Sequence, residues 1–141
     1  MPDILHRVGV ALPSARVFEA ISTVEGLCHW WVADTKGSAS LNEVIDFGFC
    51  NMRVLESHPN IVRWECISGP KEWIGTRVTF ELEFKDHQTF VLFRHTDWKE
   101  AVEFMYHCST KWATFLLSLK SYLEKDEGRP HPYDVKICVG D

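Results

Sequence analysis

The segment from Lys99 to Lys125 carries the pattern that most restricts the possible folds of this chain. Apolar residues recur in it at spacings of three and four, which predicts one long helix with an apolar stripe. The stripe consists of Val102, Met105, Cys108, Trp112, Phe115, Leu116, Leu119 and Leu123. Burying each large side chain contributes about 1.5–3 kcal/mol, so this helix must lie against another apolar surface.

Strand-like segments before the helix supply that surface. The clearest alternation runs from Thr76 to Phe84, where Val78, Phe80, Leu82 and Phe84 share one face of an antiparallel strand. The other predicted strands are Ile4–Leu12, Glu43–Cys50, Met52–Ser57, Ile61–Ile67 and Thr89–Thr96. A helix is expected to open at Pro13, and Thr23 is expected to cap a second short helix that ends at the tryptophans. This order predicts an α+β fold in which a curved antiparallel sheet wraps around the long C-terminal helix.

Length and composition limit the other possibilities. The 141 residues suit one domain over residues 1–127, followed by a tail over 128–141 in which Asp134–Val139 either adds an edge strand or stays mobile. A net charge of −5 without a basic run argues against nucleic-acid binding. No apolar run approaches the roughly 20 residues of a membrane span, and the N-terminus lacks a secretion-signal pattern. With five widely spaced cysteines, we expect a cytoplasmic protein with reduced thiols and neither metal nor cofactor.

The adjacent tryptophans Trp30 and Trp31 point to an internal pocket. Neighbouring side chains on a helix point roughly 100° apart, so one core direction hardly takes both indoles, and one of them is a candidate for a pocket rim. Trp73 and Trp98 follow loops and are candidates to close the opening, whereas Trp112 lies at the centre of the helix stripe. The predicted ligand-binding residues are Trp30, Trp31, Phe47, Trp64, Trp73, Phe80, Phe93, His95, Trp98, Met105 and Trp112.

His95 is the one weak candidate for catalysis. It shares a strand face with Val91 and Phe93, so burial would lower its pKa and keep the imidazole neutral. It then either orients a ligand or acts as a general base, or it is a hydrogen-bonded core histidine.

Other polar residues admit similar pairs of interpretations. Arg53 and Arg94 either clamp a ligand carboxylate or form surface ion pairs, and Glu65 is expected on the solvated face opposite Trp64. His107 and Cys108 diverge on the helix, which disfavours a Cys–His nucleophile, with His107 facing solvent or the tail.

A set of fold-determining positions extends from about Ile4 to Glu124. It comprises Val17 to Ile21, Gly26-Leu27 leading to Trp30-Trp31, Val54, Pro59, Trp64, Thr76 to Leu82, Thr89, Val91, Phe93, His95, and Trp112 to Lys120. In these residues the sequence resembles the START-like (helix-grip) superfamily, in particular the stand-alone proteins similar to the activator of 90-kDa heat-shock-protein ATPase. The resemblance implies a sheet wrapped around the C-terminal helix over a deep apolar cavity. Members bind lipids, hormones, polyketides or other hydrophobic molecules, and a few are cyclases or hydroxylase-type enzymes.

Two departures from the family pattern affect what the resemblance implies. The strand region Glu43–Cys50 has a single glycine, so Phe47 and Phe49 are expected to reduce the pocket volume. The sequence also shows no counterpart of the N-terminal domain that chaperone activation relies on in the eukaryotic activator. Direct control of the chaperone ATPase is therefore not expected.

Three functional hypotheses follow. The first is a cytoplasmic binding module for a small hydrophobic or amphipathic ligand, and the second is a cyclase- or hydrolase-type enzyme that uses His95. The third is a protein-interaction domain of the co-chaperone kind with a chaperone partner. A homodimer through the outer face of the sheet is also predicted, because Phe90 and Leu92 would form an exposed apolar patch there.

Overall fold

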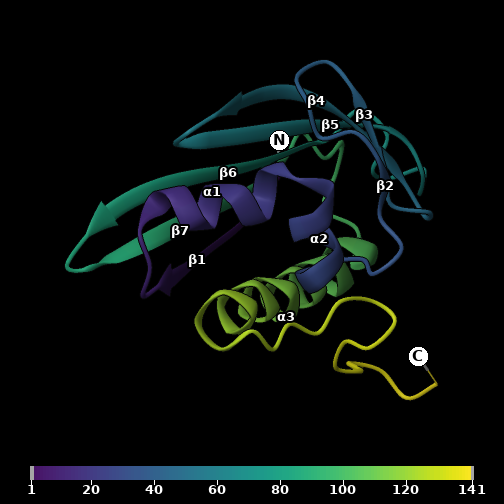
Figure 1. Ribbon diagram of the computed structural model, residues 1–141. Helices are drawn as coiled ribbons and strands as arrows, with labels where there is room; N and C mark the ends of the chain where they lie inside the picture. Colours follow the sequence, from purple (N-terminus) through teal and green to yellow (C-terminus); the bar gives the residue numbers. More distant parts are fainter. Residues whose placement is uncertain (1, 141) are drawn as a thin grey trace.

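The computed structural model describes residues 2–140, and its central element is a curved sheet of seven strands (Figure 1). Every neighbouring pair in the sheet is antiparallel. In spatial order the strands are β1 (Ile4–Val10), β7 (Gln88–Thr96), β6 (Arg77–Lys85), β5 (Ile61–Ser68), β4 (Asn51–His58), β3 (Val44–Asp46) and β2 (Lys36–Gly37).

Three helices lie on the concave side of this sheet. They are α1 (Ser14–Ser22), α2 (Val24–Trp30) and the long C-terminal α3 (Glu103–Lys125). Figure 1 shows the sheet arching over α3, with α1 and α2 beside it. The predicted α+β helix-grip fold is thereby confirmed, because a single curved sheet buries the apolar stripe of one long helix.

Cross-strand register places the large aromatic residues of the sheet on its inner face. Val78 pairs with Trp64 on one side and with His95 on the other, and Phe80 pairs with Phe93. All five of these side chains are buried. Opposite them α3 contributes the buried side chains of Met105, Cys108, Trp112, Phe115, Leu116 and Leu119.

The start of α2 explains how the tryptophan doublet reaches this core. Thr23 ends α1 in an extended conformation and accepts a hydrogen bond from Gly26 N at 3.0 Å, as expected for a cap. A Cβ on Gly26 would lie 2.7 Å from the backbone of Ala20, so only glycine lets α2 pack this closely on α1. Both tryptophans therefore arrive beside α3 at the end of α2.

The structure corrects two predicted boundaries. The strand predicted over Glu43–Cys50 is only Val44–Asp46, because Gly48 adopts a φ of 84° and donates to Asp46 Oδ1, which turns the chain. The long helix begins at Glu103 rather than near Lys99, since Val102 is still extended.

Phe84 keeps the predicted face of β6 but is 56% exposed at the hairpin end, beyond the reach of the core.

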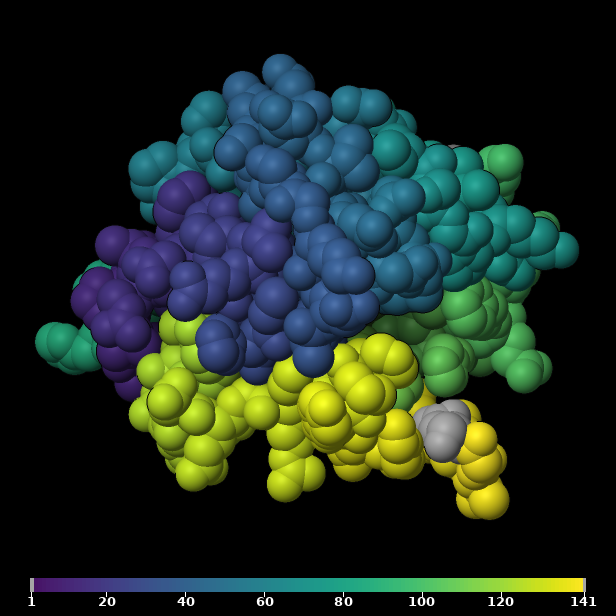
Figure 2. Space-filling view, turned by 45° about the vertical axis from the view of Figure 1, so that its right-hand side comes forward, coloured from purple at the N-terminus to yellow at the C-terminus, as the bar shows by residue number. Residues whose placement is uncertain are grey.

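The C-terminal tail packs against the helices and forms no strand over Asp134–Val139. His131 forms a parallel bridge with Val32, and its backbone N donates to Trp31 O at 2.7 Å. Arg129 N donates to Ser118 Oγ on α3 at 2.7 Å. Figure 2 shows the tail atoms, in yellow, in continuous contact with the part of the chain that contains α2. The tail is thus part of the surface around the end of α2.

No helix within residues 2–140 has the length and apolar character needed to cross a membrane. All five cysteines, Cys28, Cys50, Cys66, Cys108 and Cys138, are free thiols.

Candidate functional site

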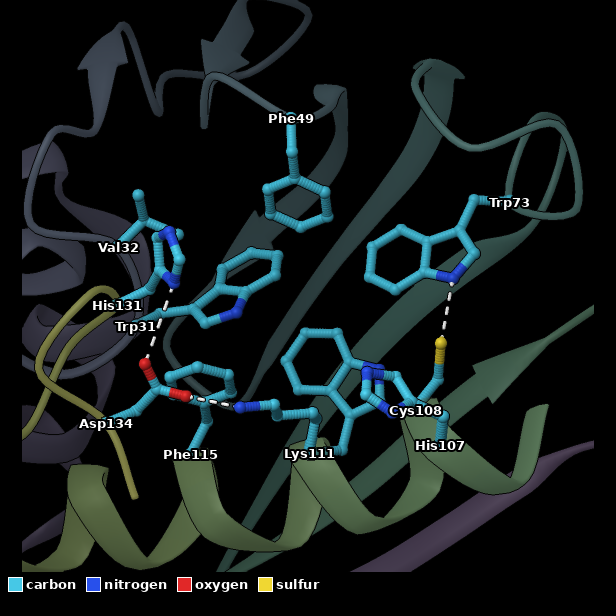
Figure 3. Close-up of a pocket in the computed structure, with 11 residues that line it drawn as sticks. Trp31, Val32, Phe49, Trp73, His107, Cys108, Lys111, Phe115, His131 and Asp134 are labelled. Carbon is cyan, nitrogen blue, oxygen red and sulfur yellow. Dashed lines mark hydrogen bonds and ion pairs between the residues drawn. The ribbon is translucent and has the colours of Figure 1, made fainter. Parts of the chain in front are cut away.

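A half-open cavity of about 230 Å³ lies between the end of α2, the α3 helix and the C-terminal tail (Figure 3). Loops contribute Trp31, Val32, Phe49 and Trp73, and α3 contributes His107, Cys108, Lys111, Trp112 and Phe115. The tail adds His131 and Asp134. Three indoles and two phenyl rings therefore form most of the wall, and the charged side chains gather at one end.

The two adjacent tryptophans point in different directions, as the helical geometry requires. Trp30 is fully buried, and its Nε1 donates to Ala20 O at 2.9 Å. Trp31, the C-cap of α2, instead borders the cavity. Its indole is parallel to that of Trp64 at a ring-centre distance of 5.8 Å, and 4.7 Å from that of Trp112. Trp31 thus forms the boundary between the packed core and the cavity.

The polar end of the cavity is an ion pair between α3 and the tail. Lys111 Nζ lies 2.6 Å from Asp134 Oδ2, and the side chain of Asp134 is only 3% exposed. Burial raises the pKa of the Asp134 carboxyl, but the hydrogen bond and charge of Lys111 outweigh this effect, and the pKa is lowered overall. Asp134 Oδ1 lies 3.6 Å from His131 Nδ1. The pair fixes the tail over one side of the cavity.

Three of the residues predicted to bind a ligand border this cavity: Trp31, Trp73 and Trp112. The structure places the other eight in the buried core, away from the cavity wall. They are Trp30, Phe47, Trp64, Phe80, Phe93, His95, Trp98 and Met105.

The aromatic rings among these eight residues pack against one another in the core. The ring centres of Phe80 lie 5.2 Å from Trp64 and 5.3 Å from Phe93, and Phe47 packs on Trp31 at 4.2 Å. The deep cavity implied by the family resemblance is therefore reduced to its outer end. Phe47 fills part of the interior, whereas Phe49 stands at the cavity rim and is 46% exposed.

His95 lies at the centre of a closed chain of hydrogen bonds. Trp112 Nε1 donates to His95 Nδ1 at 3.1 Å, so the ring proton is on Nε2, which donates to Thr76 Oγ1 at 2.8 Å. Thr76 Oγ1 in turn donates to Trp73 O at 2.6 Å. Burial lowers the pKa of His95 to about 3, so the imidazole is neutral at ordinary pH. This geometry favours the core role of His95 over that of a general base.

The adjacent Cys108 and His107 both border the cavity but do not form a nucleophilic pair. Cys108 Sγ accepts from Trp73 Nε1 at 3.3 Å, whereas the His107 ring stacks on Phe104. Burial raises the pKa of the Cys108 thiol to about 11, so it stays protonated. In residues 2–140, no three His, Cys, Asp or Glu side chains are grouped so as to hold a metal ion.

The polar strand residues lie outside the cavity, on the outer face of the sheet. Arg94 pairs with Glu81 at 3.1 Å, and Arg53 donates to the backbone oxygen of Asn42 at 3.1 Å. Glu65 lies between Arg53 and Arg77 in cross-strand register. Arg94 therefore forms a surface ion pair as predicted, whereas Arg53 bonds to a backbone oxygen at the surface.

Several cavity residues were not predicted from the sequence, namely Val32, Lys111, Phe115, His131 and Asp134. Phe115 was assigned to the helix stripe, and nothing in the polar tail marks Asp134 as a residue that becomes buried. The spacing of Lys111 and Phe115, one helical turn apart on the face of Cys108, is the sequence signal that could have placed these two residues on the wall.

Comparison with solved structures identifies the family. The solution structure of an Aha1 dimer from Colwellia psychrerythraea is 38% identical, with a TM-score of 0.82 over 91% of this chain and 100% of that one. A Staphylococcus saprophyticus protein is 20% identical, with a TM-score of 0.74 over 92% of this chain and 97% of its own. CalU16 from Micromonospora echinospora is 15% identical, with a TM-score of 0.74 over 88% and 77% of the two chains.

The two weaker likenesses show the fold alone. No protein-family model matches the sequence, and no curated protein does. The extent of the Aha1 match, together with the helix-grip fold described above, shows that this chain belongs to the Aha1-like family of START-like proteins.

Proposed function

We propose that this chain is a binding module that holds a small hydrophobic or amphipathic molecule in the cavity beside Trp31. The observation that carries the proposal is the half-open cavity of about 230 Å³ with walls of indole and phenyl rings. Ligand sites are typically concave and apolar, with a few polar groups that fix orientation. The Lys111–Asp134 pair supplies such groups at one end. The five free thiols, three of them buried, support a cytoplasmic location.

An enzymatic role has less support in the site geometry. His95 uses both ring nitrogens in the core, and the Cys108 thiol has a raised pKa. Neither residue therefore offers an activated base or nucleophile to a molecule in the cavity.

The test of ligand binding uses two exposed phenylalanines. Phe49 stands at the cavity rim, whereas Phe84 lies at the β6–β7 hairpin end, so Phe49→Ala and Phe84→Ala are the same chemical change with similar exposure. A library of small aromatic and aliphatic molecules is screened for an increase in the melting temperature, which rises with ligand concentration relative to Kd.

Hits that lose about tenfold in affinity in Phe49→Ala and keep it in Phe84→Ala support the proposal, since tenfold corresponds to about 1.4 kcal/mol of lost contact. A library without hits, or hits whose affinity is the same in Phe49→Ala and wild-type protein, would contradict the proposed binding function.

A protein-interaction role of the co-chaperone kind is a second candidate, favoured by the 38% identity with an Aha1 dimer. The predicted patch on the outer face is partly covered: Phe90 and Leu92 are half-buried, and the Arg7 guanidinium lies 4.5 Å from the Phe90 ring centre.

A homodimer through this face is tested by analytical sedimentation of the double variant Phe90→Ser/Leu92→Ser. A dimer that persists in the double variant rules this interface out, and recovery of a chaperone only with Phe90 and Leu92 intact favours the co-chaperone role.

A further inference from the structure

The three indoles of the cavity wall differ in their hydrogen bonding. Trp73 Nε1 donates to Cys108 Sγ, and Trp112 Nε1 donates to His95 Nδ1. Trp31 Nε1 forms no hydrogen bond with any residue of the described range 2–140, although the side chain is only 3% exposed. A buried indole N–H normally has a partner, so Trp31 is the exception in this wall.

The position of the Trp31 nitrogen distinguishes it from a merely unsatisfied core group. Among residues 2–140, two side-chain polar atoms are both sealed from solvent and without a hydrogen bond, Trp98 Nε1 and Asp134 Oδ1. Trp31 Nε1 is not one of them, so it remains accessible, and Trp31 borders the cavity. Figure 3 shows this nitrogen on the side of the indole that faces the other lining side chains.

We propose that the cavity selects a neutral apolar molecule with a carbonyl oxygen, and that Trp31 Nε1–H donates a hydrogen bond to that oxygen. The inference rests on the proposed function of the cavity and specifies the class of its ligand. An apolar body fits the rings around Trp31, and a carbonyl supplies the acceptor that the protein itself does not provide.

The electrostatics of the wall favour a neutral acceptor over a carboxylate. The Lys111 ammonium group already lies 2.6 Å from Asp134 Oδ2, and Oδ1 of this buried carboxylate has no hydrogen-bond donor. A ligand carboxylate would therefore lie beside an existing negative charge whose ammonium partner is already engaged, and it would lose part of its hydration between the rings.

Two probes of nearly identical shape test the inference. Acetophenone carries the carbonyl, whereas α-methylstyrene has a CH₂ group in place of its oxygen. By calorimetric titration, we expect wild-type protein to bind acetophenone roughly two- to tenfold more tightly, the range of one net hydrogen bond. Benzoate, the anionic analogue, is expected to bind more weakly than acetophenone.

Two variants assign this preference to one nitrogen. Trp31→Phe keeps an aromatic ring without the N–H, and the preference for acetophenone should then be lost. Trp73→Phe removes an N–H that is already bonded to Cys108, so it should keep the preference. If Trp31→Phe does not fold, the Trp31 indole N–H resonance of wild-type protein replaces it, with a downfield shift expected for acetophenone alone.

The outcomes separate the two proposals. Equal binding of both probes by wild-type protein overturns the carbonyl inference and leaves the proposed cavity function standing. Tighter binding of benzoate overturns the neutral class. A wild-type protein that binds neither probe contradicts the proposed function and this inference together.

Discussion

Trp30 and Trp31 are neighbours in the sequence, yet they belong to two different regions of the interior. Trp30 lies in the sealed region together with Trp64, Phe80 and Phe93, where the rings pack against one another. Trp31 opens onto the cavity, where the rings of Phe49 and Trp73 leave a volume of about 230 Å³. The same residue type is therefore part of the packed core in one region and borders a cavity in the other. The difference follows from their directions at the end of α2, since Trp30 points into the core whereas Trp31, the C-cap, borders the cavity.

The largest expected difference between the two regions is in stability. Phe80→Ala removes a fully buried ring and should lower the free energy of unfolding by about 3–5 kcal/mol. Phe49→Ala is the same change at a ring that is 46% exposed, and it should cost about 1 kcal/mol or less. Urea denaturation of both variants measures the contrast. Equal losses would show that the sealed and open regions do not differ energetically.

Acid should destabilise the sealed region through His95. Its pKa is about 3 in the folded protein and 6.5 ordinarily, so between these values the unfolded chain binds a proton that the folded protein does not. Stability is thus fully present above pH 6.5 and falls as the pH falls, by about 1.4 kcal/mol per pH unit for one proton. Between pH 6.5 and 4.5 this amounts to roughly 2–3 kcal/mol.

The matched variant for this prediction is His95→Gln, which removes the titrating group. The unfolding free energy of this variant is measured across the same pH range. Its dependence on pH should be weaker than that of wild-type protein by about 1.4 kcal/mol per pH unit, the contribution of one proton. An unchanged slope would mean that His95 is protonated in the folded protein, and the closed hydrogen-bond chain from Trp112 to Thr76 would then be incorrect.

The smallest expected effect concerns the tail beside the cavity. Asp134→Asn removes the charge that pairs with Lys111, and a loss of about 1–2 kcal/mol of tail docking is expected for a pair that is only partly buried. Amide hydrogen exchange should become faster at Ala33 and His131, which connect the tail to the end of α2. Asp86→Asn, in the exposed β6–β7 turn, is the control and should leave these amides unchanged.

The same tail contact has a defined acid sensitivity. The pKa of Asp134 is lowered in the folded protein, so its stabilising contribution is present above the ordinary value of 3.8 and is lost as the pH falls through the lower folded value. If amide hydrogen exchange in the tail of wild-type protein already becomes faster well above pH 3.8, a group other than Asp134 holds the tail in place.

The fold could be predicted because its strongest signals are periodic. The stripe through Met105, Trp112 and Leu119 requires a partner surface, and the alternation in β6 supplies one. The strand predicted over Glu43–Cys50 ends too late, because the turn at Gly48 depends on a local hydrogen bond to Asp46 that alternation does not reveal.

The candidate site was less predictable because it depends on partners distant in the sequence. The doublet indicated that an indole, the second one first of all, borders a pocket, but not which residues lie around it. Position on a strand face put His95 near the interior, but only the hydrogen bonds from Trp112 and to Thr76 show that the ring is fully engaged. Asp134 becomes buried only because Lys111, 23 residues earlier, lies opposite it. A single sequence carries no local signal for such a contact.

A crystal structure of the protein with 4-bromoacetophenone, whose bromine is located by anomalous scattering, shows directly whether a ketone binds beside Trp31. We expect a bromine site in the cavity bordered by Trp31, Trp73 and Trp112, with the carbonyl oxygen within hydrogen-bond distance of Trp31 Nε1. An empty cavity at saturating probe, or a bromine site among Trp64, Phe80 and Phe93, would contradict this expectation.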